Sequence, residues 1–272
     1  MSRPEHTGPP ELFYNDTEAR KYTQNSRMID IQSTMAERAV ELLALDEEAG
    51  PALLLDIGCG SGLSGDVISE LGHYWLGYDI APSMLAVAAE RDLEGSLLLA
   101  DAGQGLIFRA GSFDGAVSVS ALQWLCNADS REQSVPKRLR RLFTATYAAL
   151  RRGARAVFQW YPENSAQVEL VTAAAMRCGF TGGLVVDYPN SAKAKKVFLV
   201  LSAGGSQPLP KALAAEPHQV QNAPRSKTSF GGKGKASKGS KAWIQARKER
   251  DRKKGREVRE DSKYTGRRRK AL

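Results

Sequence analysis

The sequence contains few of the features that mark a secreted, membrane-spanning or metal-binding protein. Its 272 residues include three cysteines, Cys59, Cys126 and Cys178, which are far apart, odd in number and without the paired spacing of metal ligands. We expect them to be reduced thiols of a nuclear or cytosolic protein, with no metal site. No apolar run approaches the roughly 18 residues that a membrane span needs. The first residues also lack the apolar stretch of a secretory signal.

Acidic residues are scarce in one part of the chain. Residues 1–202 carry 19 Lys and Arg against 24 Asp and Glu, a balance of −5, whereas residues 203–272 carry 20 against 6, a balance of +14. The sequence therefore predicts a mildly acidic globular body with a strongly basic tail. Such a tail is attracted to polyanions, most often nucleic acid.

Composition divides the chain into four segments. Residues 1–27 form a Pro-rich N-terminal segment, and residues 28–202 have the patterning of a folded domain. Residues 203–237 are rich in Gly, Pro, Ser and Lys and too poor in bulky apolar residues to offset their ordering entropy, so we expect a flexible linker. Residues 238–272 form the basic tail. A helix starting near Ser240 is expected there, with too few apolar side chains to fold alone.

Short apolar segments alternate with helical patterns along the folded domain. Helices are expected near 28–45, from Leu63, from Pro82 and over 135–150, with one more after the fifth strand. This alternation predicts a seven-stranded, mostly parallel, Rossmann-like α/β sheet with helices on both faces. The expected strands lie at 51–57, 73–79, 96–101, 113–120, 154–161, 183–188 and 195–202.

The glycines that come after the first expected strand point to the type of ligand. A dinucleotide turn has glycines at positions one, three and six, but here they fall at Gly58, Gly60 and Gly62 and the sixth position is Leu63. Asp56 precedes the turn and is expected to face the ligand crevice. A carboxylate there is a poor neighbour for a pyrophosphate and a good one for an ammonium group.

The pattern D-I-G-C-G-S-G resembles the first motif of class I S-adenosylmethionine-dependent methyltransferases. Asp79 ends the second expected strand, 21 residues after Gly58, where a carboxylate can bind both ribose hydroxyls. Asp101 and Ala102, at the end of the third strand, match the position that contacts adenine in this class. Together with the neighbouring Cys59 and Ile80, these residues predict an S-adenosylmethionine site in place of an NAD site.

The segment after the fourth expected strand, SVSALQWLCN, constrains the methyl acceptor. It lacks the Asn/Asp-Pro-Pro-Tyr/Phe box of enzymes that methylate the adenine amino group. Cys126 comes after Leu125 and not after Pro, so covalent catalysis on cytosine is not expected. The three histidines, His6, His73 and His218, fall outside the predicted site. An acceptor that is already nucleophilic, such as guanine N7, needs alignment and desolvation but no general base.

Longer stretches resemble the eukaryotic small-subunit (18S) ribosomal RNA guanine-N7 methyltransferases over nearly the whole chain. The resemblance implies methyl transfer from S-adenosylmethionine to N7 of one guanosine in 18S rRNA during pre-40S ribosome assembly. It also implies a nuclear protein of nucleoplasm and nucleolus, with the cytoplasm as a second location. The stretches that carry it include LDIGCGSGLSGDVISELGHYWLGYDI, SVSALQWLCNA, YPENSAQVELVTAAAMRCGF, DYPNSAKAKKVFLVL and SKYTGRRRKAL.

The resemblance further implies a small zinc-binding activator protein that forms a heterodimer with the methyltransferase. The sequence supplies a physical reason for such a partner. In the usual strand order, residues 96–100 form an edge strand with three successive leucines. Such an edge aggregates unless something covers it, and an added partner strand would protect it.

Several residues near the predicted crevice have two interpretations each. Trp124 could stack on a flipped guanine or pack under the cofactor loop. Glu163 could accept hydrogen bonds from guanine N1–H and N2–H2, with Asn164 beside it, but the same pair could be a helix-starting turn with Asn164 as its N-cap. Tyr14 and Tyr22 could form a lid over the cofactor or be core aromatics. Basic residues near the fifth strand could contact RNA or be solvated: Lys137, Arg138, Arg140, Arg141, Arg151 and Arg152.

Two other classes of function stay open on the sequence alone. A small-molecule methyltransferase would leave the +14 tail unexplained. A non-catalytic assembly factor would bind pre-ribosomes and keep S-adenosylmethionine as a structural ligand.

Overall fold

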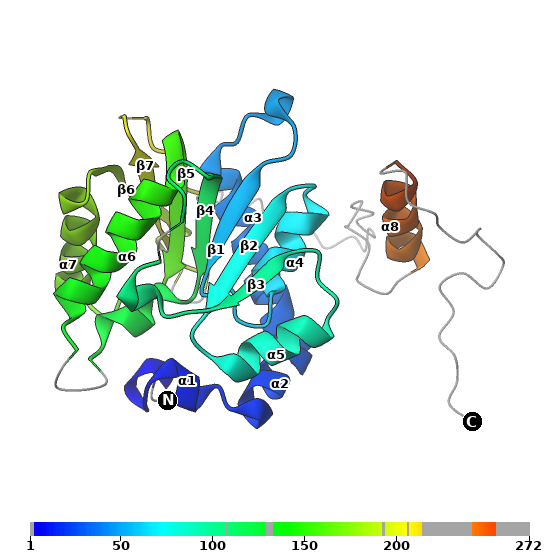
Figure 1. Ribbon diagram of the computed structural model, residues 1–272, viewed down its shortest axis with the longest axis horizontal. Coiled ribbons are helices and arrows are strands. Elements are labelled where there is room, and N and C mark those ends of the chain that lie inside the picture. Colours follow the sequence, from blue (N-terminus) through cyan, green and yellow to red (C-terminus); the bar gives the residue numbers. More distant parts are fainter. Residues whose placement is uncertain are drawn as a thin grey trace, which may run out of the picture. The chain divides into compact units, whose positions relative to one another are not determined.

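The computed structural model describes residues 3–106, 108–128, 133–191, 194–205, 207–213 and 241–253. The chain divides into two compact units, residues 1–217 and residues 218–272. The first unit contains a twisted sheet with helices on both faces, and the second contains one described helix, α8 (Figure 1).

Seven strands form a single sheet in the order β3-β2-β1-β4-β5-β7-β6. The pairs among β1 to β5 are parallel, whereas β7 runs antiparallel to both β5 and β6. The predicted α/β class and mostly parallel sheet are confirmed. The strands are β1 Leu53–Ile57, β2 Tyr74–Asp79, β3 Ser96–Leu99, β4 Phe113–Val119, β5 Leu150–Trp160, β6 Phe180–Asp187 and β7 Lys196–Ala203.

Helices cover the two faces of the sheet as separate layers. The helices α3 (Ser26–Leu43) and α4 (Leu63–Glu70) pack on one face, and α6 (Val135–Ala149) and α7 (Ser165–Arg177) pack on the other (Figure 1). The helix α5 (Pro82–Glu90) comes after β2. Short 3-10 helices lie at η1 Pro4–His6, η2 Glu47–Ala49, η3 Ala102–Gln104 and η4 Leu122–Cys126.

The apolar spacing of the helices accounts for this layering. In α6, Leu139, Leu142, Phe143 and Thr146 recur at helical spacing and are all buried. Burying each large apolar side chain contributes about 1.5–3 kcal/mol relative to leaving it exposed. The β1 strand is buried from Leu54 onward because helices cover both faces of the central sheet.

The N-terminal segment contains two helices that the apolar pattern did not predict. The helix α1 (Pro10–Phe13) and the helix α2 (Asp16–Gln24) lie at the carboxyl edge of the parallel strands (Figure 1). Asn15 caps α2, its Oδ1 accepting from Thr17 N and Glu18 N at 3.1 Å. The segment therefore lies over the edge of the sheet at which an α/β fold binds its ligand.

Part of the predicted linker is attached to the body of the protein. Lys211 O accepts a hydrogen bond from buried Arg38 at 2.8 Å, and Leu213 N donates to Asp187 Oδ1 at 2.7 Å. Arg38 and Asp187 in turn form a buried ion pair at 2.9 Å. Composition gives no sign of these backbone contacts, so it predicted a flexible segment from residue 203 onward. The part of that prediction that concerns residues 214–237 lies outside the described residues.

The expected tail helix is present as α8, Lys241–Lys253, although the predicted cap Ser240 lies outside the described residues. Within α8, the Arg247 guanidinium lies 5.6 Å from the centroid of the Trp243 ring. Among the described helices, none is long and apolar enough to cross a membrane. The same residues contain no cluster of three or more His, Cys, Asp or Glu side chains arranged to hold a metal.

Candidate active site

A cavity lies at the carboxyl ends of β1, β2, β3 and β4, where the strand order reverses between β1 and β4. Open α/β sheets bind their ligands at such a reversal. We call it the cofactor cavity. The predicted cofactor residues that line it are Gly58, Cys59, Gly60, Asp79, Ile80, Asp101 and Ala102.

The glycine turn has a backbone that side chains would disturb. Gly58 and Gly60 have φ angles of +71° and +53°, in the left-handed region. A Cβ added at Gly58 would lie 2.4 Å from Ala121 Cβ, and one at Gly60 would lie 2.9 Å from Met84 Cε. The backbone N–H groups of Gly58 and Cys59 both donate to Tyr78 O, at 2.9 and 3.1 Å. The positive φ angles and these close contacts together disfavour any larger residue in the turn, which we call the glycine cradle.

Gly62 has a different role from the other two glycines. It is not among the residues that line the cavity. It is the N-cap of α4 with a φ angle of +77°, and an added Cβ would lie 2.1 Å from Leu93 Cδ1. Its visible function is to let the start of α4 pack closely on the loop after α5, and the predicted cofactor contact stays a prediction.

Asp79 holds the loops on both sides of the cavity. Its Oδ2 accepts from Gly60 N and its Oδ1 accepts from Ala81 N, each at 2.8 Å. Burial raises the pKa of this carboxyl, and the backbone hydrogen bonds oppose that shift. Asp79 ends β2 and lines the cavity, and its predicted interaction with ribose hydroxyls stays a prediction.

Asp56 lies beneath the glycine turn and is completely buried. Its Oδ2 accepts from Ser64 Oγ at 2.5 Å, while its Oδ1 has no hydrogen-bond partner. Burial, together with the nearby Asp79, raises the pKa of Asp56 to about 7, against the effect of the Ser64 hydrogen bond. Asp56 does not line the cavity. Its predicted interaction with an ammonium group therefore stays a prediction, supported by the unpartnered oxygen.

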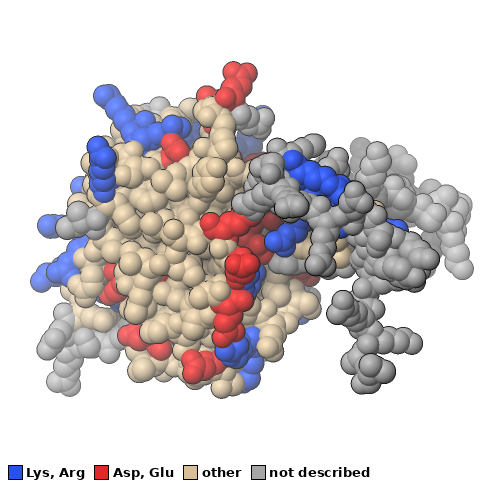
Figure 2. Space-filling model, turned by 45° about the vertical axis from the view of Figure 1, so that its right-hand side comes forward, with Lys and Arg blue, Asp and Glu red and all other residues tan. Residues whose placement is uncertain are grey.

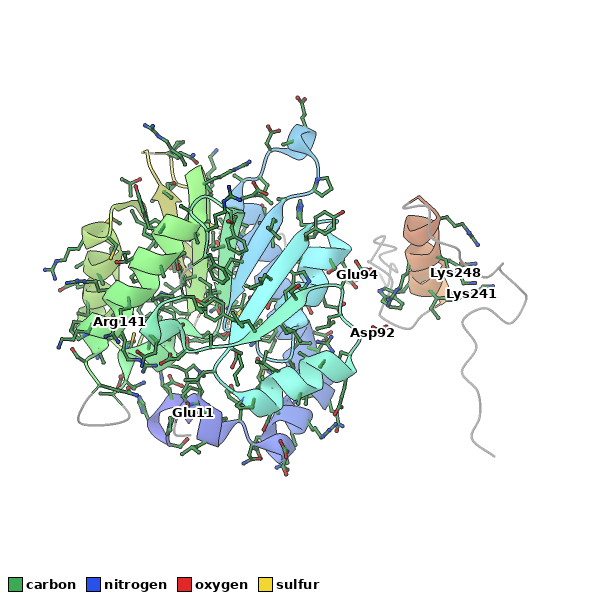
Figure 3. All side chains as sticks on the ribbon, in the orientation of Figure 1. Glu11, Asp92, Glu94, Arg141, Lys241 and Lys248 are labelled. Carbon is green, nitrogen blue, oxygen red and sulfur yellow. The ribbon has the colours of Figure 1, made fainter. Side chains whose placement is uncertain are left out.

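Arg138 belongs to the cavity wall, whereas the sequence predicted that it would lie on a basic surface. The charge run predicted a solvated or RNA-binding side chain, but Arg138 is 6% exposed and lines the cofactor cavity. Its Nη2 donates to Asp101 Oδ1 at 3.0 Å, and Gly103 N donates to the same oxygen at 2.7 Å. The prediction of a basic surface is wrong for Arg138. Its neighbour Arg141 lies on the exposed side of α6 (Figure 3) and bonds to Gln104.

Aromatic side chains from the N-terminal segment close one side of the cavity. Tyr14 and Tyr22 both line it, with their ring centroids 5.8 Å apart in an edge-to-face arrangement. Burial raises the pKa of Tyr14 to about 12, with smaller contributions from the negative charges of Asp79 and Glu5. The Tyr14 hydroxyl is therefore a neutral hydrogen-bonding group at physiological pH.

A second cavity adjoins the first, and we call it the acceptor cavity. Tyr14, Tyr22, Gln32, Ser120 and Trp124 line both cavities. Trp124 contacts Phe13 and Tyr14, with ring centroids 5.7 Å apart in each pair. The remaining wall of the acceptor cavity includes Arg3, Lys21, Gln123, Tyr161 and Lys196.

Glu163 and Asn164 line neither cavity. Glu163 is exposed and its carboxylate lies 3.7 Å from His6 Nε2. Asn164 is the N-cap of α7, its Oδ1 accepting from Gln167 N at 2.9 Å. The helix-starting turn is therefore present, and a part for this pair in positioning the guanine stays a prediction.

The arrangement fits S-adenosylmethionine. The glycine cradle, the orphaned buried Asp56 oxygen and the carboxylates that end β2 and β3 suit a ligand with a cationic head and a ribose. Two solved structures have the same fold. A Haemonchus contortus phosphoethanolamine N-methyltransferase 2 in complex with S-adenosyl-L-methionine is 18% identical, with a TM-score of 0.51 over 71% of this chain and 58% of that chain. A Haloferax volcanii putative methyltransferase is 17% identical, with a TM-score of 0.52 over 70% and 97%.

A family model described as a methyltransferase domain matches residues 55–158, from β1 into β5. Fold, cradle and family model together define a class I S-adenosylmethionine-dependent methyltransferase. A second model, described as a methyltransferase involved in Williams-Beuren syndrome, matches residues 201–271.

Sequence identity to curated relatives shows to which family of this class the chain belongs. The chain is 58% identical to the 18S rRNA (guanine-N(7))-methyltransferase of Mus musculus over 98% of this chain and 97% of that one. It is 47% identical to the 18S rRNA (guanine(1575)-N(7))-methyltransferase of Saccharomyces cerevisiae over 99% and 98%. The chain belongs to the 18S rRNA (guanine-N7)-methyltransferase family.

Proposed function

We propose that the cofactor cavity holds S-adenosylmethionine and that the acceptor cavity holds the guanine that receives the methyl group. The reaction is that of the family: transfer of the methyl group of S-adenosylmethionine to N7 of a guanosine in 18S rRNA. The observation that supports this assignment of the two cavities is their shared wall, which includes Tyr14, Ser120 and Trp124. Ligands in the two cavities would meet at these three residues.

We assign a part to each residue that would hold the cofactor. Asp79 would accept from the ribose hydroxyls, Asp101 and Ala102 would lie beside the adenine, and Asp56 below the turn would attract the amino acid ammonium. Gly58, Cys59, Gly60 and Ile80 would supply close backbone contacts, and Gly62 would set the start of α4. S-adenosylmethionine supplies the methyl group, bound to a positively charged sulfur.

Methyl transfer to guanine N7 needs no proton transfer, because the N7 lone pair lies in the ring plane and carries no proton. The chain's contribution is alignment and the exclusion of water. Burial raises the pKa of Cys59 well above its usual range, so this thiol is protonated and is no nucleophile. Trp124 lines both cavities and would stack on a flipped base, as aromatic side chains do for unpaired RNA bases. Glu163 and Asn164 remain candidates for positioning the same base from outside the described cavity walls.

Mapping of N7-methylguanosine in cellular 18S rRNA tests this function against a non-catalytic role in assembly. Cells that carry only an Asp79→Lys enzyme, at wild-type protein level, should lose the modified base because the ribose site and the brace of the glycine turn are both removed. Reduction and aniline cleavage of the rRNA detects the base. Full methylation in those cells would contradict the proposed cofactor site.

We propose further that a small zinc-binding activator protein covers the edge of β3. The edge is exposed: Leu98 is 39% and Leu99 is 57% accessible. Figure 2, which brings the right-hand side of Figure 1 forward, shows an area of the body without charged side chains beside a band of Asp and Glu. The Haloferax methyltransferase of the same fold was solved in complex with a Trm112 methyltransferase activator. A strand added to β3 would pair its free backbone groups and cover the leucines.

The substrate and the tail together suggest where the enzyme works. We propose that the basic segment 238–272 docks on the pre-40S particle and that the enzyme acts in the nucleoplasm and nucleolus during assembly. Residues 238–272 carry 15 Lys and Arg against 5 Asp and Glu, a balance of +10 that supports attraction to rRNA.

A further inference from the structure

Gln123 carries a buried hydrogen-bond acceptor without a partner. The residue lies in η4, directly after β4, and is 6% exposed. Its Oε1 is buried and accepts no hydrogen bond from any described residue. Gln123 is among the residues that line the acceptor cavity and not among those that line the cofactor cavity. A buried carbonyl oxygen without a donor costs free energy. Because Gln123 lines the acceptor cavity, a ligand that enters this cavity is a source of the missing donor.

The orientation of the Gln123 amide is fixed. Its Nε2 donates to Ser120 O at 2.7 Å. A backbone carbonyl only accepts, so the NH2 end of the amide must face Ser120. A free glutamine can rotate its amide to suit either a donor or an acceptor. Gln123 cannot, because rotation would place two carbonyl oxygens against each other.

Ser120 is itself held in place by a second glutamine. It has a φ angle of +58°, a conformation that a non-glycine residue adopts only when its surroundings impose it. Ser120 N donates to Gln159 O at 3.0 Å and to Gln159 Oε1 at 3.1 Å, and Ser120 Oγ also donates to Gln159 Oε1 at 3.0 Å. Gln32 Nε2 donates to Ser120 Oγ at 3.3 Å. The carbonyl that orients Gln123 is therefore rigidly placed.

We propose that Gln123 Oε1 recognises the guanine by accepting a hydrogen bond from its N1–H or N2–H2 group. This inference rests on the proposed function of the acceptor cavity. Only purines have an N7, so the enzyme must distinguish guanine from adenine. Adenine presents an acceptor at N1, which a fixed carbonyl oxygen repels, whereas guanine presents donors at N1 and N2. An amide of fixed orientation thus selects guanine over adenine.

The position of Gln123 agrees with the geometry of the base. N1 and N2 lie on the opposite side of guanine from N7. The N7 atom must face the cofactor cavity, so the groups that recognise N1 and N2 belong on the far side of the acceptor cavity. Gln123 lines only the acceptor cavity, and its neighbour Trp124 lines both. The two residues are placed to bind one base by its edge and by its face.

Two substitutions separate recognition from structural support. Gln123→Leu removes both the acceptor and the hydrogen bond to Ser120. Gln123→Glu also loses the bond to Ser120 but keeps oxygen acceptors for the guanine donors. The substrate is 40S subunits from cells that carry the Asp79→Lys enzyme, incubated with labelled S-adenosylmethionine. Gln207→Leu is the matched control, because Gln207 Nε2 donates to Gly153 O at 2.9 Å outside both cavities.

The expected result is a fall in the single-turnover rate of about 10- to 100-fold for Gln123→Leu. Gln123→Glu should retain clearly more activity than Gln123→Leu, and the affinity for S-adenosylmethionine should change less than about twofold in both. Equal losses in the two variants, or weaker cofactor binding in both, would show a structural role and overturn the inference. A Gln123→Leu rate within twofold of wild type would do the same. Failure of the wild-type enzyme to methylate the particles would instead overturn the proposed function and this inference with it.

Discussion

The Asp79 carboxylate joins the glycine turn to the start of α5, because one oxygen accepts from Gly60 N and the other from Ala81 N, both at 2.8 Å. The same carboxylate is the group that we assign to the ribose. Binding of the ribose and support of the cradle thus depend on one side chain, and they should be lost together.

Asp79→Asn should weaken S-adenosylmethionine binding by at least about tenfold, because the amide replaces one acceptor with a donor that faces an N–H group. The free energy of unfolding should fall by about 1–3 kcal/mol. Calorimetric titration and thermal unfolding measure the two effects. Asp66→Asn is the matched control, since Asp66 lies on α4, pairs with Arg91 at 3.2 Å and does not line the cavity. Equal cofactor affinity in Asp79→Asn and wild type would contradict the ribose assignment.

Binding of S-adenosylmethionine should release protons near neutral pH if its ammonium group interacts with Asp56. The pKa of Asp56 is raised to about 7 in the free protein, so part of the population carries the proton at pH 7. A nearby ammonium favours the ionised carboxylate and lowers that pKa, which releases the proton. Affinity should therefore rise between pH 6 and pH 7.

Calorimetry in buffers of different ionisation enthalpy measures this proton release. Asp56→Asn is the appropriate comparison, because the amide cannot titrate while the amino group of the ligand still can. The same release in both proteins would show that Asp56 is not the responsible group.

Leu99→Lys should weaken the heterodimer with the activator, because it places a charge on the exposed edge of β3 where a partner strand would lie. Co-purification from cells that express both proteins is the measurement. Leu71→Lys is the matched control, since Leu71 is 48% exposed at the end of α4 and not on the sheet edge. Loss of the complex in both variants, or in neither, would argue against binding at β3.

Deletion of residues 238–272 should leave S-adenosylmethionine binding intact but reduce association with pre-40S particles. Every residue assigned to the cofactor lies in the first unit, and the attraction of the tail for rRNA is electrostatic and sensitive to salt. Trp243→Ala should cause part of the same loss without changing the net charge, because Trp243 packs with Arg247 on α8. Sedimentation with pre-40S particles at physiological salt measures both effects. Full association of the truncated enzyme would leave nuclear import as the better explanation of the tail's charge.

The strands and most helices could be predicted because their signals are local. The continuous apolar run before Gly58 predicts a strand buried on both faces, and the structure has β1 there. The strand β5 begins at Leu150, four residues before its predicted start at Ala154. Its first residues include exposed Arg151 and Arg152, so the sequence there lacks the apolar pattern of a strand.

The helices α1 and α2 could not be predicted in this way, because contacts distant in sequence hold them. Arg20 on α2 bonds Glu90 on α5 through both of its terminal nitrogens, at 2.8 and 2.6 Å. The helix α2 itself has a single fully buried residue, Ala19. One buried apolar residue among nine forms no repeating pattern, so the sequence of α2 does not predict a helix there.

The residues of the site also divide into those that local sequence signals predict and those that depend on distant contacts. Residues at strand ends, such as Asp79 and Asp101, could be predicted because the topology brings strand ends together. Arg138 and Gln123 could not, since the position of each depends on a partner, Asp101 near the end of β3 for Arg138 and the strained Ser120 for Gln123. For Gln123, the segment SALQW gives no hint that Ser120 has a positive φ angle. The notable sequence signal is a polar residue between two apolar ones, Leu122 and Trp124, in a segment that is buried.

The central claim is that the protein methylates N7 of a guanosine in 18S rRNA, with S-adenosylmethionine in one of the two adjoining cavities and the guanine in the other. The most direct measurement incubates the purified enzyme, with its activator, with labelled S-adenosylmethionine and 40S subunits that lack the modification. Reduction and aniline cleavage then locate the methylated base. We predict one N7-methylguanosine in 18S rRNA with the wild-type enzyme. We predict none with Gly60→Arg, whose side chain would fill the glycine turn and whose fold is checked by circular dichroism. Label at another atom or in another RNA, or an active Gly60→Arg enzyme, would contradict the account.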